Sequence, residues 1–474
     1  MGPSKGTPPC STDSLDPPTF ACEYKSAAAY LDLAANAHGA EKGHLVHRAL
    51  ERIPHDAPQV VEVGPGGGAA ISFLAAQLAR DRAPGRSVHL TLIEAPGVAS
   101  QALAQAMEEF AEVGACTLTQ GLAQDIGALL PQSVDVIAAS ALLHEVYSYG
   151  GGYRGLHAMM RTLPTVLNPD GFFAYRDVYA VQASSLHERV VQSYGAQSWL
   201  QFLRMFIPQY LNRGIHPYHH HDDEILARQN SRIIPIEELG THTSTFVAAP
   251  VGMFREIQRH YITFRDHVWR SGALGFTPIL EGQLSHDWID LRAGHKRVHY
   301  RFTETDWLSL TRKGTLLAIS EPYADHYTID GDIFDEVTEV ALTAFLVAVE
   351  QGDVGCAQVW SSWLEREGRE TYAYLTIDEL LTAFAVNSIE SDNPRPTVLM
   401  PAQKSDILRK ERNYYNRFLA KRVANPLIDA KQLVLFQNIS LADGEKLDQA
   451  LEAIQGFCSK PNLARIYAAV NSRR

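Results

Sequence analysis

The sequence predicts an α/β fold with a doubly wound, mostly parallel sheet, followed by a large, mainly helical C-terminal region. Three observations lead to this prediction. Short apolar runs rich in β-branched residues alternate with helical segments between residues 58 and 178. The first of these runs ends in a glycine-rich turn. From about residue 330, apolar residues recur mainly at helical spacing.

The alternating region contains five expected strands, separated by helices. Strands separated by helices favour a parallel sheet with helices on both faces. In such sheets, ligands bind beyond the carboxyl ends of the strands. The expected strands are residues 60–63, 88–94, 116–120, 134–139 and 172–175, and the clearest helices are residues 69–80, 98–110 and 155–167.

The turn after the first strand is the strongest single signal. Residues 60–68 read Val-Val-Glu-Val-Gly-Pro-Gly-Gly-Gly, and a helix is expected to begin at Ala69. Glycine lets the backbone approach a ligand closely, and the start of a helix offers free N–H groups. A glycine motif is informative only in this order of strand, turn and helix.

The turn resembles motif I of the class I S-adenosylmethionine (SAM)-dependent methyltransferases, which have a Rossmann-like fold. The resemblance covers residues 58–178 and implies that Gly64, Gly66 and Gly68 lie against the amino-acid tail of SAM. It also implies that Glu62 orients the ammonium group of SAM. A different nucleotide remains an alternative for a turn of this kind.

Later landmarks follow in the order that this resemblance requires. Glu94 ends the second strand, where the family's acid accepts hydrogen bonds from both ribose hydroxyls, a task that suits a carboxylate. Asp125, after the third strand, resembles the residue near the adenine amine. Residues 168–172 resemble the family's turn before the fifth strand.

The end of the fourth strand supplies the catalytic candidates. Ser140 is expected to lie beside the cofactor, and His144 and Glu145 follow it. In similar small-molecule O-methyltransferases, a histidine here removes a proton from the acceptor, and its pKa suits that task. Alternatively, His144 only packs against the cofactor or caps the next helix, and Glu145 is a rival base.

Composition excludes several classes of protein. The net charge of −12 argues against binding to nucleic acid. Five scattered cysteines, without metal-ligand spacing, favour a reduced, cytoplasmic protein. No signal peptide and no apolar run long enough to span a membrane are found. No metal site is expected.

The chain is too long for one ordinary domain. Residues 1–20 are expected to be disordered and residues 21–57 to form helices. A SAM-binding domain is expected over residues 58–250, with a helical insertion at about residues 183–230 and a strand near residue 245 that closes the sheet. Residues 251–474 are expected to bind the substrate or to form a homodimer.

Two further segments carry unusual side chains. Residues 216–224 are rich in histidine and acidic residues, and we interpret them as a solvated loop rather than a metal site. Residues 405–423 combine basic and aromatic side chains. They predict an amphipathic helix, with RNA or an acidic carrier protein as the alternative ligand.

Together these features predict a methyltransferase that uses SAM to methylate an oxygen, nitrogen or carbon atom of a small organic acceptor, and secondary metabolism fits the appended C-terminal region. Two alternatives stay open. One is transfer of the aminocarboxypropyl group of SAM, or its cyclisation. The other is a non-catalytic protein that binds SAM as a scaffold or sensor.

Overall fold

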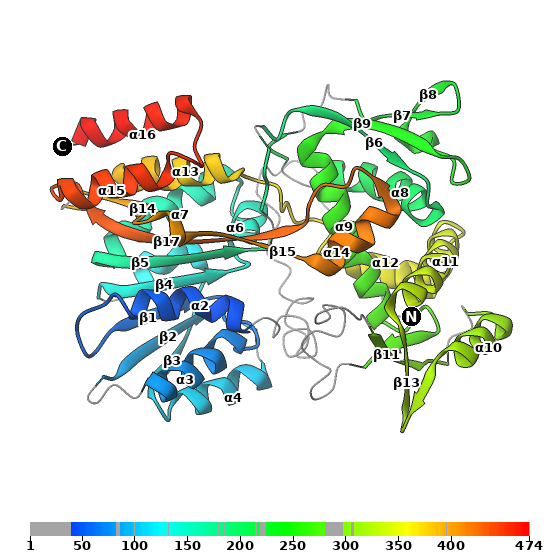
Figure 1. The fold of residues 1–474 in the computed structure, drawn as a ribbon, viewed down its shortest axis with the longest axis horizontal. Helices are drawn as coiled ribbons and strands as arrows, with labels where there is room; N and C mark the ends of the chain where they lie inside the picture. Colours follow the sequence, from blue (N-terminus) through cyan, green and yellow to red (C-terminus); the bar gives the residue numbers. More distant parts are fainter. Residues whose placement is uncertain are drawn as a thin grey trace, which may run out of the picture.

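The structure, a computed structural model, describes residues 39–81, 86–98, 100–130, 132–178, 180–183, 185–213, 216–218, 224–279, 297–304, 308–394 and 396–473. It has two lobes, which stand left and right in Figure 1. The predicted disorder of residues 1–20 lies outside the described residues. The N-terminal helices predicted for residues 21–57 are described only from residue 39 onward.

The first lobe, called the sheet lobe below, is built on an eight-stranded sheet. Its strand order is β14-β17-β5-β4-β1-β2-β3, and β15 also pairs with β17. The pairs β3–β2, β2–β1, β1–β4 and β4–β5 are parallel, whereas β17 runs antiparallel to β5, β14 and β15. The strands are β1 (Gln59–Val63), β2 (Val88–Glu94), β3 (Gly114–Gln120), β4 (Val134–Ser140), β5 (Leu167–Asp177), β14 (Thr397–Pro401), β15 (Ile407–Glu411) and β17 (Ala430–Ser440).

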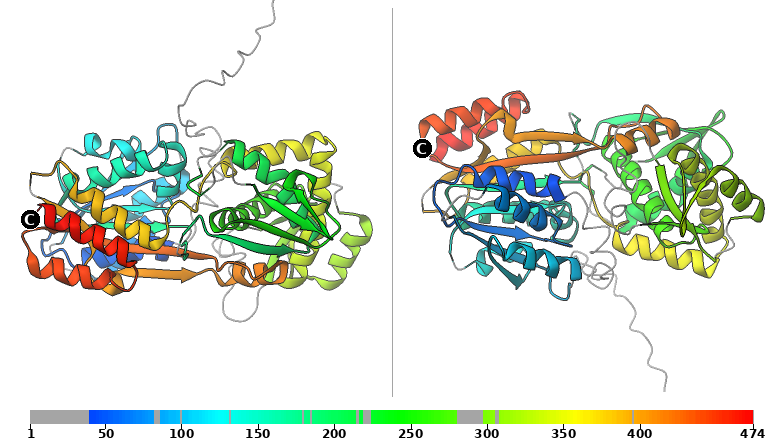
Figure 2. Two further views of the ribbon diagram at one scale, coloured as in Figure 1. Left: turned by 90° about the horizontal axis from the view of Figure 1, so that it is seen from above. Right: turned by 60° about the horizontal axis from the view of Figure 1, so that its bottom comes forward.

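Helices cover both faces of this sheet, which confirms the predicted doubly wound, Rossmann-like class (Figures 1 and 2). One face packs against α2 (Gly39–Leu50), α3 (Ala69–Asp81) and α4 (Gln101–Phe110). The other packs against α6 (Leu143–Tyr149), α7 (Tyr153–Val166), α13 (Ile377–Ile389), α15 (Gly444–Ile454) and α16 (Lys460–Arg473). The short elements η2 (Ala123–Asp125) and α5 (Ile126–Leu129) follow β3.

The second lobe, called the inserted lobe below, lies in sequence between strands of that sheet. The chain leaves after β5 and returns before α13, and it leaves again between β15 and β17. The helices of the inserted lobe are α8 (Gln197–Arg213), α9 (Val251–Arg270), α10 (Leu310–Ile319), α11 (Gly331–Glu350), α12 (Val354–Arg366) and α14 (Asn413–Arg422). The large sheet is therefore built from two separate parts of the chain, residues 59–177 and 397–440. Most of the inserted lobe lies between these two parts in the sequence.

Two smaller sheets belong to the inserted lobe. One has the order β16-β6-β9-β7-β8 and the other β10-β11-β13-β12. The strands of the first are β6 (Arg189–Tyr194), β7 (Leu226–Gln229), β8 (Arg232–Pro235), β9 (Thr245–Pro250) and β16 (Val423–Ala424), and those of the second are β10 (Phe276–Pro278), β11 (Arg297–Phe302), β12 (Glu321–Tyr323) and β13 (His326–Asp330).

Three sequence predictions are wrong here. The strand near residue 245 does not close the large sheet, because β9 pairs with β6 and β7 instead. The insertion at residues 183–230 is not purely helical, since it contains β6 and β7. Residues 405–423 form β15 and the shorter helix α14, because the backbone of residues 407–411 pairs with β17.

The core of the inserted lobe is aromatic. Trp199 stacks on Tyr261 with a ring separation of 3.8 Å, and Phe202, Phe264 and Trp363 pack around them.

No single helix among the described residues is long and apolar enough to cross a membrane. The pair α11 and α12 is long and apolar enough only when the two helices are taken together, and they are bent by 100° relative to each other.

Candidate functional site

The carboxyl ends of the parallel strands gather the predicted site residues at one edge of the sheet. Val63 pairs with Ile93 on β2 and with Ala139 on β4, and Ser140 pairs with Arg176 on β5. The residues that follow these strands therefore meet at the same edge. This is the edge where open α/β sheets bind ligands.

The glycine turn has the backbone that its sequence predicts. Gly64, Gly66 and Gly68 have φ angles of 70°, 57° and 79°, in the left-handed region that favours glycine. A Cβ on Gly68 would lie 2.7 Å from the Cβ of Ala106, so this glycine lets α3 pack closely against α4. A Cβ on Gly64 would make only an ordinary contact of 3.4 Å with Leu142.

Glu94 connects the second strand to the turn. Its Oε2 accepts a hydrogen bond from the Gly66 N–H at 3.2 Å, and its Oε1 accepts one from the Ala95 N–H at 2.8 Å. Burial raises the pKa of Glu94, against the effect of these two donors. A carboxylate has about four acceptor positions, so two remain for hydroxyl donors from a ligand.

Glu62 lies buried beside Glu94 and faces Lys42 of α2. Burial raises the pKa of Glu62 to about 7, and the attraction of Lys42 offsets only part of this. Burial, with the nearby Arg176 guanidinium, lowers the pKa of Lys42 to about 8. A buried carboxyl group in this position is suited to receive a cationic group such as an ammonium.

Ser140 and Asp125 occupy different surroundings. Ser140 Oγ accepts a hydrogen bond from Arg176 Nη1 at 3.3 Å, and two nitrogens of Arg176 also donate to Glu41 of α2. Ser140 is therefore part of the edge. Asp125 is exposed in η2, beyond the end of β3, and its place near an adenine amine stays a prediction.

His144 is held between two carboxylates. Its Nδ1 lies 2.7 Å from Asp177 Oδ1, and its Nε2 lies 3.5 Å from Glu370 Oε2. Its own backbone N–H donates to Asp177 Oδ2 at 3.2 Å. Burial alone would lower the pKa of His144, but the two carboxylates outweigh it and raise the pKa to about 10.

The partners of His144 come from the segment that returns from the inserted lobe. The Tyr372 ring packs on the imidazole at 4.9 Å, and its hydroxyl lies 2.8 Å from carboxylate oxygens of both Glu367 and Glu370. Tyr374 donates its hydroxyl proton to Asp177 Oδ2 at 2.7 Å. His144 therefore joins the sheet edge to the inserted lobe.

Sequence analysis missed these partners. Asp177 ends β5 next to β4, so its place at the carboxyl edge was a signal that could have identified it. Glu370, Tyr372 and Tyr374 gave no local signal, because they lie more than 200 residues from His144 in sequence. Tyr147 of α6 is also buried beside these residues, and its ring stacks on Tyr374.

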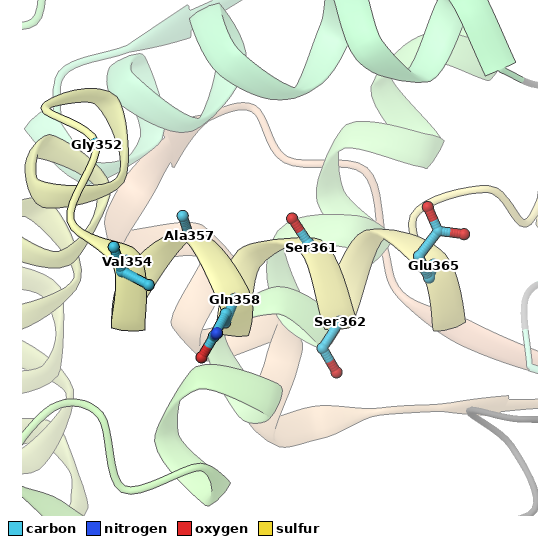
Figure 3. A pocket seen from close by; sticks show the side chains of 7 residues that line it. All are labelled: Gly352, Val354, Ala357, Gln358, Ser361, Ser362 and Glu365. Atoms are coloured by element: carbon cyan, nitrogen blue, oxygen red, sulfur yellow. The ribbon is translucent and has the colours of Figure 1, made fainter. Parts of the chain in front are cut away.

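The other segments flagged in the sequence are separate from this edge. His216 Nε2 lies 3.0 Å from the Tyr210 carbonyl oxygen, and Tyr218 is buried in the inserted lobe, whereas residues 219–223 lie outside the described residues. A surface hollow of about 470 Å³ lies on α12 and the turn before it, and Figure 3 shows the side chains that line it. Its lining offers no cluster of catalytic groups; the lining residues are Gly352, Val354, Ala357, Gln358, Ser361, Ser362 and Glu365.

No protein-family model and no curated protein matches the chain. Solved structures that resemble it in part are methyltransferases. An O-methyltransferase family protein from Burkholderia thailandensis is 12% identical, with 50% of this chain and 65% of that chain covered and a TM-score of 0.29. The CurJ carbon methyltransferase is 12% identical, with 45% and 54% covered and a TM-score of 0.25.

A third partial match is CalS10, an amino pentose methyltransferase from Micromonospora echinaspora solved with SAM bound. It is 18% identical, with 33% of this chain and 57% of that chain covered and a TM-score of 0.22. The chain spans about half the length of the solved structures that it matches. Because these sequence identities and TM-scores are low, the function has to be inferred from the chain's own residues.

Proposed function

We propose that the chain is a SAM-dependent methyltransferase that acts on a small organic acceptor. The observation that carries this proposal is the contact between Gly66 N–H and the Glu94 carboxylate, at the end of β2 and beside the left-handed glycine turn. This geometry offers close backbone approach, a buried acceptor for two hydroxyls, and Glu62 for an ammonium group. Those are the groups that SAM presents.

Bound SAM would supply an electrophilic methyl group, which an acceptor atom takes with its own electron pair. The chain's residues would then mainly position the two reactants, which can contribute most of the rate. Ser140 ends β4, and Glu145 follows it at the same edge. We propose that, as long as its carboxylate binds no cation, the partly exposed Glu145 is better placed than His144 to take a proton from a hydroxyl acceptor.

We also propose that His144 is not the general base of the reaction. A base must be unprotonated at working pH. The carboxylates of Asp177 and Glu370 instead raise the pKa of His144 to about 10, so in the absence of another cation it keeps its proton at neutral pH. Its contribution is to hold α6 and the returning segment together at the edge.

We infer that the inserted lobe binds the acceptor or forms a dimer, since its returning segment contacts the same edge.

The alternative reactions, transfer of a methyl group and transfer of an aminocarboxypropyl group, differ in the mass of the product. A methyl group adds about 14 Da and an aminocarboxypropyl group about 101 Da, while both reactions rely on the same positioning. A scaffold would bind SAM and modify nothing.

The first test is calorimetric titration of the full chain with S-adenosylhomocysteine. We expect micromolar binding that Glu94→Ala abolishes and that Glu109→Ala, an exposed control on α4, leaves unchanged. Binding of NAD or ATP in place of S-adenosylhomocysteine would refute the proposal. Equal binding by wild type and Glu94→Ala would remove the role assigned to Glu94.

A further inference from the structure

We propose that His144, Glu145 and Glu370 form a binding site for a divalent first-row metal cation at the junction of the two lobes. One nitrogen of His144 and one carboxylate oxygen from each glutamate all lie within 4.8 Å of one another. Imidazole nitrogen and carboxylate oxygen are ligands that Zn²⁺ and Mn²⁺ accept. This differs from the sequence expectation that no metal is bound.

The orientation of the imidazole supports a ligand role. Asp177 Oδ1 engages Nδ1 at 2.7 Å and leaves Nε2 turned toward Glu370. A carboxylate behind the ring is the usual partner of a metal-bound histidine, because it fixes the tautomer and the ring angle. Tyr374 and the Val178 N–H donate to Asp177 in turn and hold it in place.

Glu370, the second ligand, is also held in place by a neighbouring side chain. The Tyr372 hydroxyl lies 2.8 Å from Glu370 Oε2, and the Tyr372 ring packs on His144. His144 Nε2 and Glu370 Oε2 are 3.5 Å apart. Two ligand atoms of a tetrahedral zinc ion are about 3.4 Å apart when each bond is about 2.1 Å long. His144 Nε2 and Glu370 Oε2 are therefore already about as far apart as two atoms bound to the same zinc ion.

The third ligand is less enclosed. Glu145 is partly exposed, whereas His144 and Glu370 are buried. No separation in the set exceeds 4.8 Å, so closure on a cation requires an inward movement of at most about 1.5 Å. Three protein ligands also leave one position for water or a substrate oxygen, which is the pattern of catalytic rather than structural zinc sites.

The charge at this junction suits a divalent cation. Three carboxylate side chains, from Asp177, Glu145 and Glu370, lie around the His144 imidazole. Asp177 and Glu370 are buried, and buried carboxylates are paired or bind a metal.

The location of the cluster indicates what would bind at the open position of the cation. This step rests on the proposed function. Glu145 acts electrostatically on Glu94, the proposed ribose ligand, so the cluster lies on the cofactor side of the junction. An acceptor oxygen bound at the open position would then face the same edge of the sheet. The cation site itself rests only on the geometry of the three ligands and Asp177.

Zinc and manganese titrations of the full chain test the proposal after metal has been removed with a chelator. Because the histidine tract could bind zinc on its own, the background variant carries His219→Ala, His220→Ala and His221→Ala. In calorimetry, we expect this background to bind one equivalent of Zn²⁺ or Mn²⁺ and to melt at a higher temperature with the metal than without it.

Four variants in that background locate the site. Glu145→Gln and Glu370→Gln should each weaken metal binding at least 10-fold, and Asp177→Asn should weaken it about 10- to 100-fold. Glu379→Gln, a matched control that removes the carboxylate capping α13, should bind as the background does. If Glu370→Gln fails to fold by circular dichroism, Glu145→Gln decides the test.

Absence of binding by both metals, or binding that Glu145→Gln leaves unchanged, would overturn the cation site. S-adenosylhomocysteine titration of the same proteins keeps the two proposals separate. Retained S-adenosylhomocysteine binding without metal binding would remove only the cation site. Metal binding without S-adenosylhomocysteine binding would remove only the proposed function and the role of the open position.

Discussion

The two lobes bury charged side chains in different surroundings. In the sheet lobe, Glu62, Glu94 and His144 lie at the carboxyl edge, and the layers between sheet and helices are mainly apolar, apart from the ion pairs that Glu41 of α2 makes with Arg176 and Lys431. In the inserted lobe, charged groups lie within the aromatic core itself. Arg265 pairs with Asp335 there, and Glu339 accepts a hydrogen bond from Tyr261.

This difference separates structural charges from functional ones. Arg265, Asp335 and Glu339 face partners within the inserted lobe, so they hold its helices together. Buried groups in both lobes have perturbed pKa values, but those at the sheet edge also lie where open α/β sheets bind ligands, which is the combination typical of functional sites. Four predictions, from the largest expected effect to the smallest, can break or sharpen this contrast.

The largest effect is expected inside the inserted lobe. Arg265→Met leaves Asp335 buried without its guanidinium partner, although the Tyr414 hydroxyl still donates to it. The free energy of unfolding should fall by about 3–5 kcal/mol in chemical denaturation. The double variant Arg265→Met/Asp335→Leu should recover part of this loss. Equal stability of the single and double variants would show that the pair is not a structural unit.

The second effect concerns the junction and depends on pH. Because the folded pKa of His144 is about 10 and the ordinary value is 6.5, its stabilisation is complete below pH 6.5 and is lost as the pH rises toward 10. Denaturation in chelator should therefore show that wild type loses more stability over this range than His144→Gln does. Parallel curves for the two proteins would contradict the assignment.

The third effect is expected on binding rather than stability. Gly64→Ala places a Cβ at φ 70°, so the turn is strained by about 1 kcal/mol and can shift away from the ligand. Affinity for S-adenosylhomocysteine should fall at least about 10-fold, which corresponds to about 1.4 kcal/mol. Gly352→Ala, at φ 83° with no atom within 4 Å of the new Cβ, is the matched control and should bind normally.

The smallest effect concerns the cap where the chain re-enters the sheet lobe. Thr376 Oγ1 accepts from the Glu379 N–H at 3.2 Å, and the Glu379 carboxylate accepts from the Thr376 N–H at 2.8 Å. Thr376→Ala should lower the free energy of unfolding by about 1 kcal/mol. Thr376→Ser retains the hydroxyl and should lose much less. Thermal denaturation measures both.

Local patterns explain what sequence could predict. The glycine turn and the acid at the end of β2 depend on neighbouring residues, so their predicted places in the fold are confirmed, while their roles toward SAM stay predictions. The strands β14 and β17 complete the sheet from residues 397–440, and no local signal marks that partnership. For the same reason, the pairing of His144 with Glu370 could not be predicted.

The structure of the region after β5 was harder to predict from the sequence, for a physical reason. A helical insertion was expected at about residues 183–230, but residues 189–194 form β6 because β9 and β16 supply strand partners. The inserted lobe is held by contacts between distant segments, whereas the first five strands of the sheet follow one another with short connections.

Hydrogen–deuterium exchange with and without S-adenosylhomocysteine tests the central claim most directly, because it compares both lobes in one experiment. The account predicts slower exchange at residues 64–68 and 94–97 when the ligand is present, with the core helices α8 and α9 unchanged. Protection confined to the inserted lobe, with the glycine turn unaffected, would contradict it.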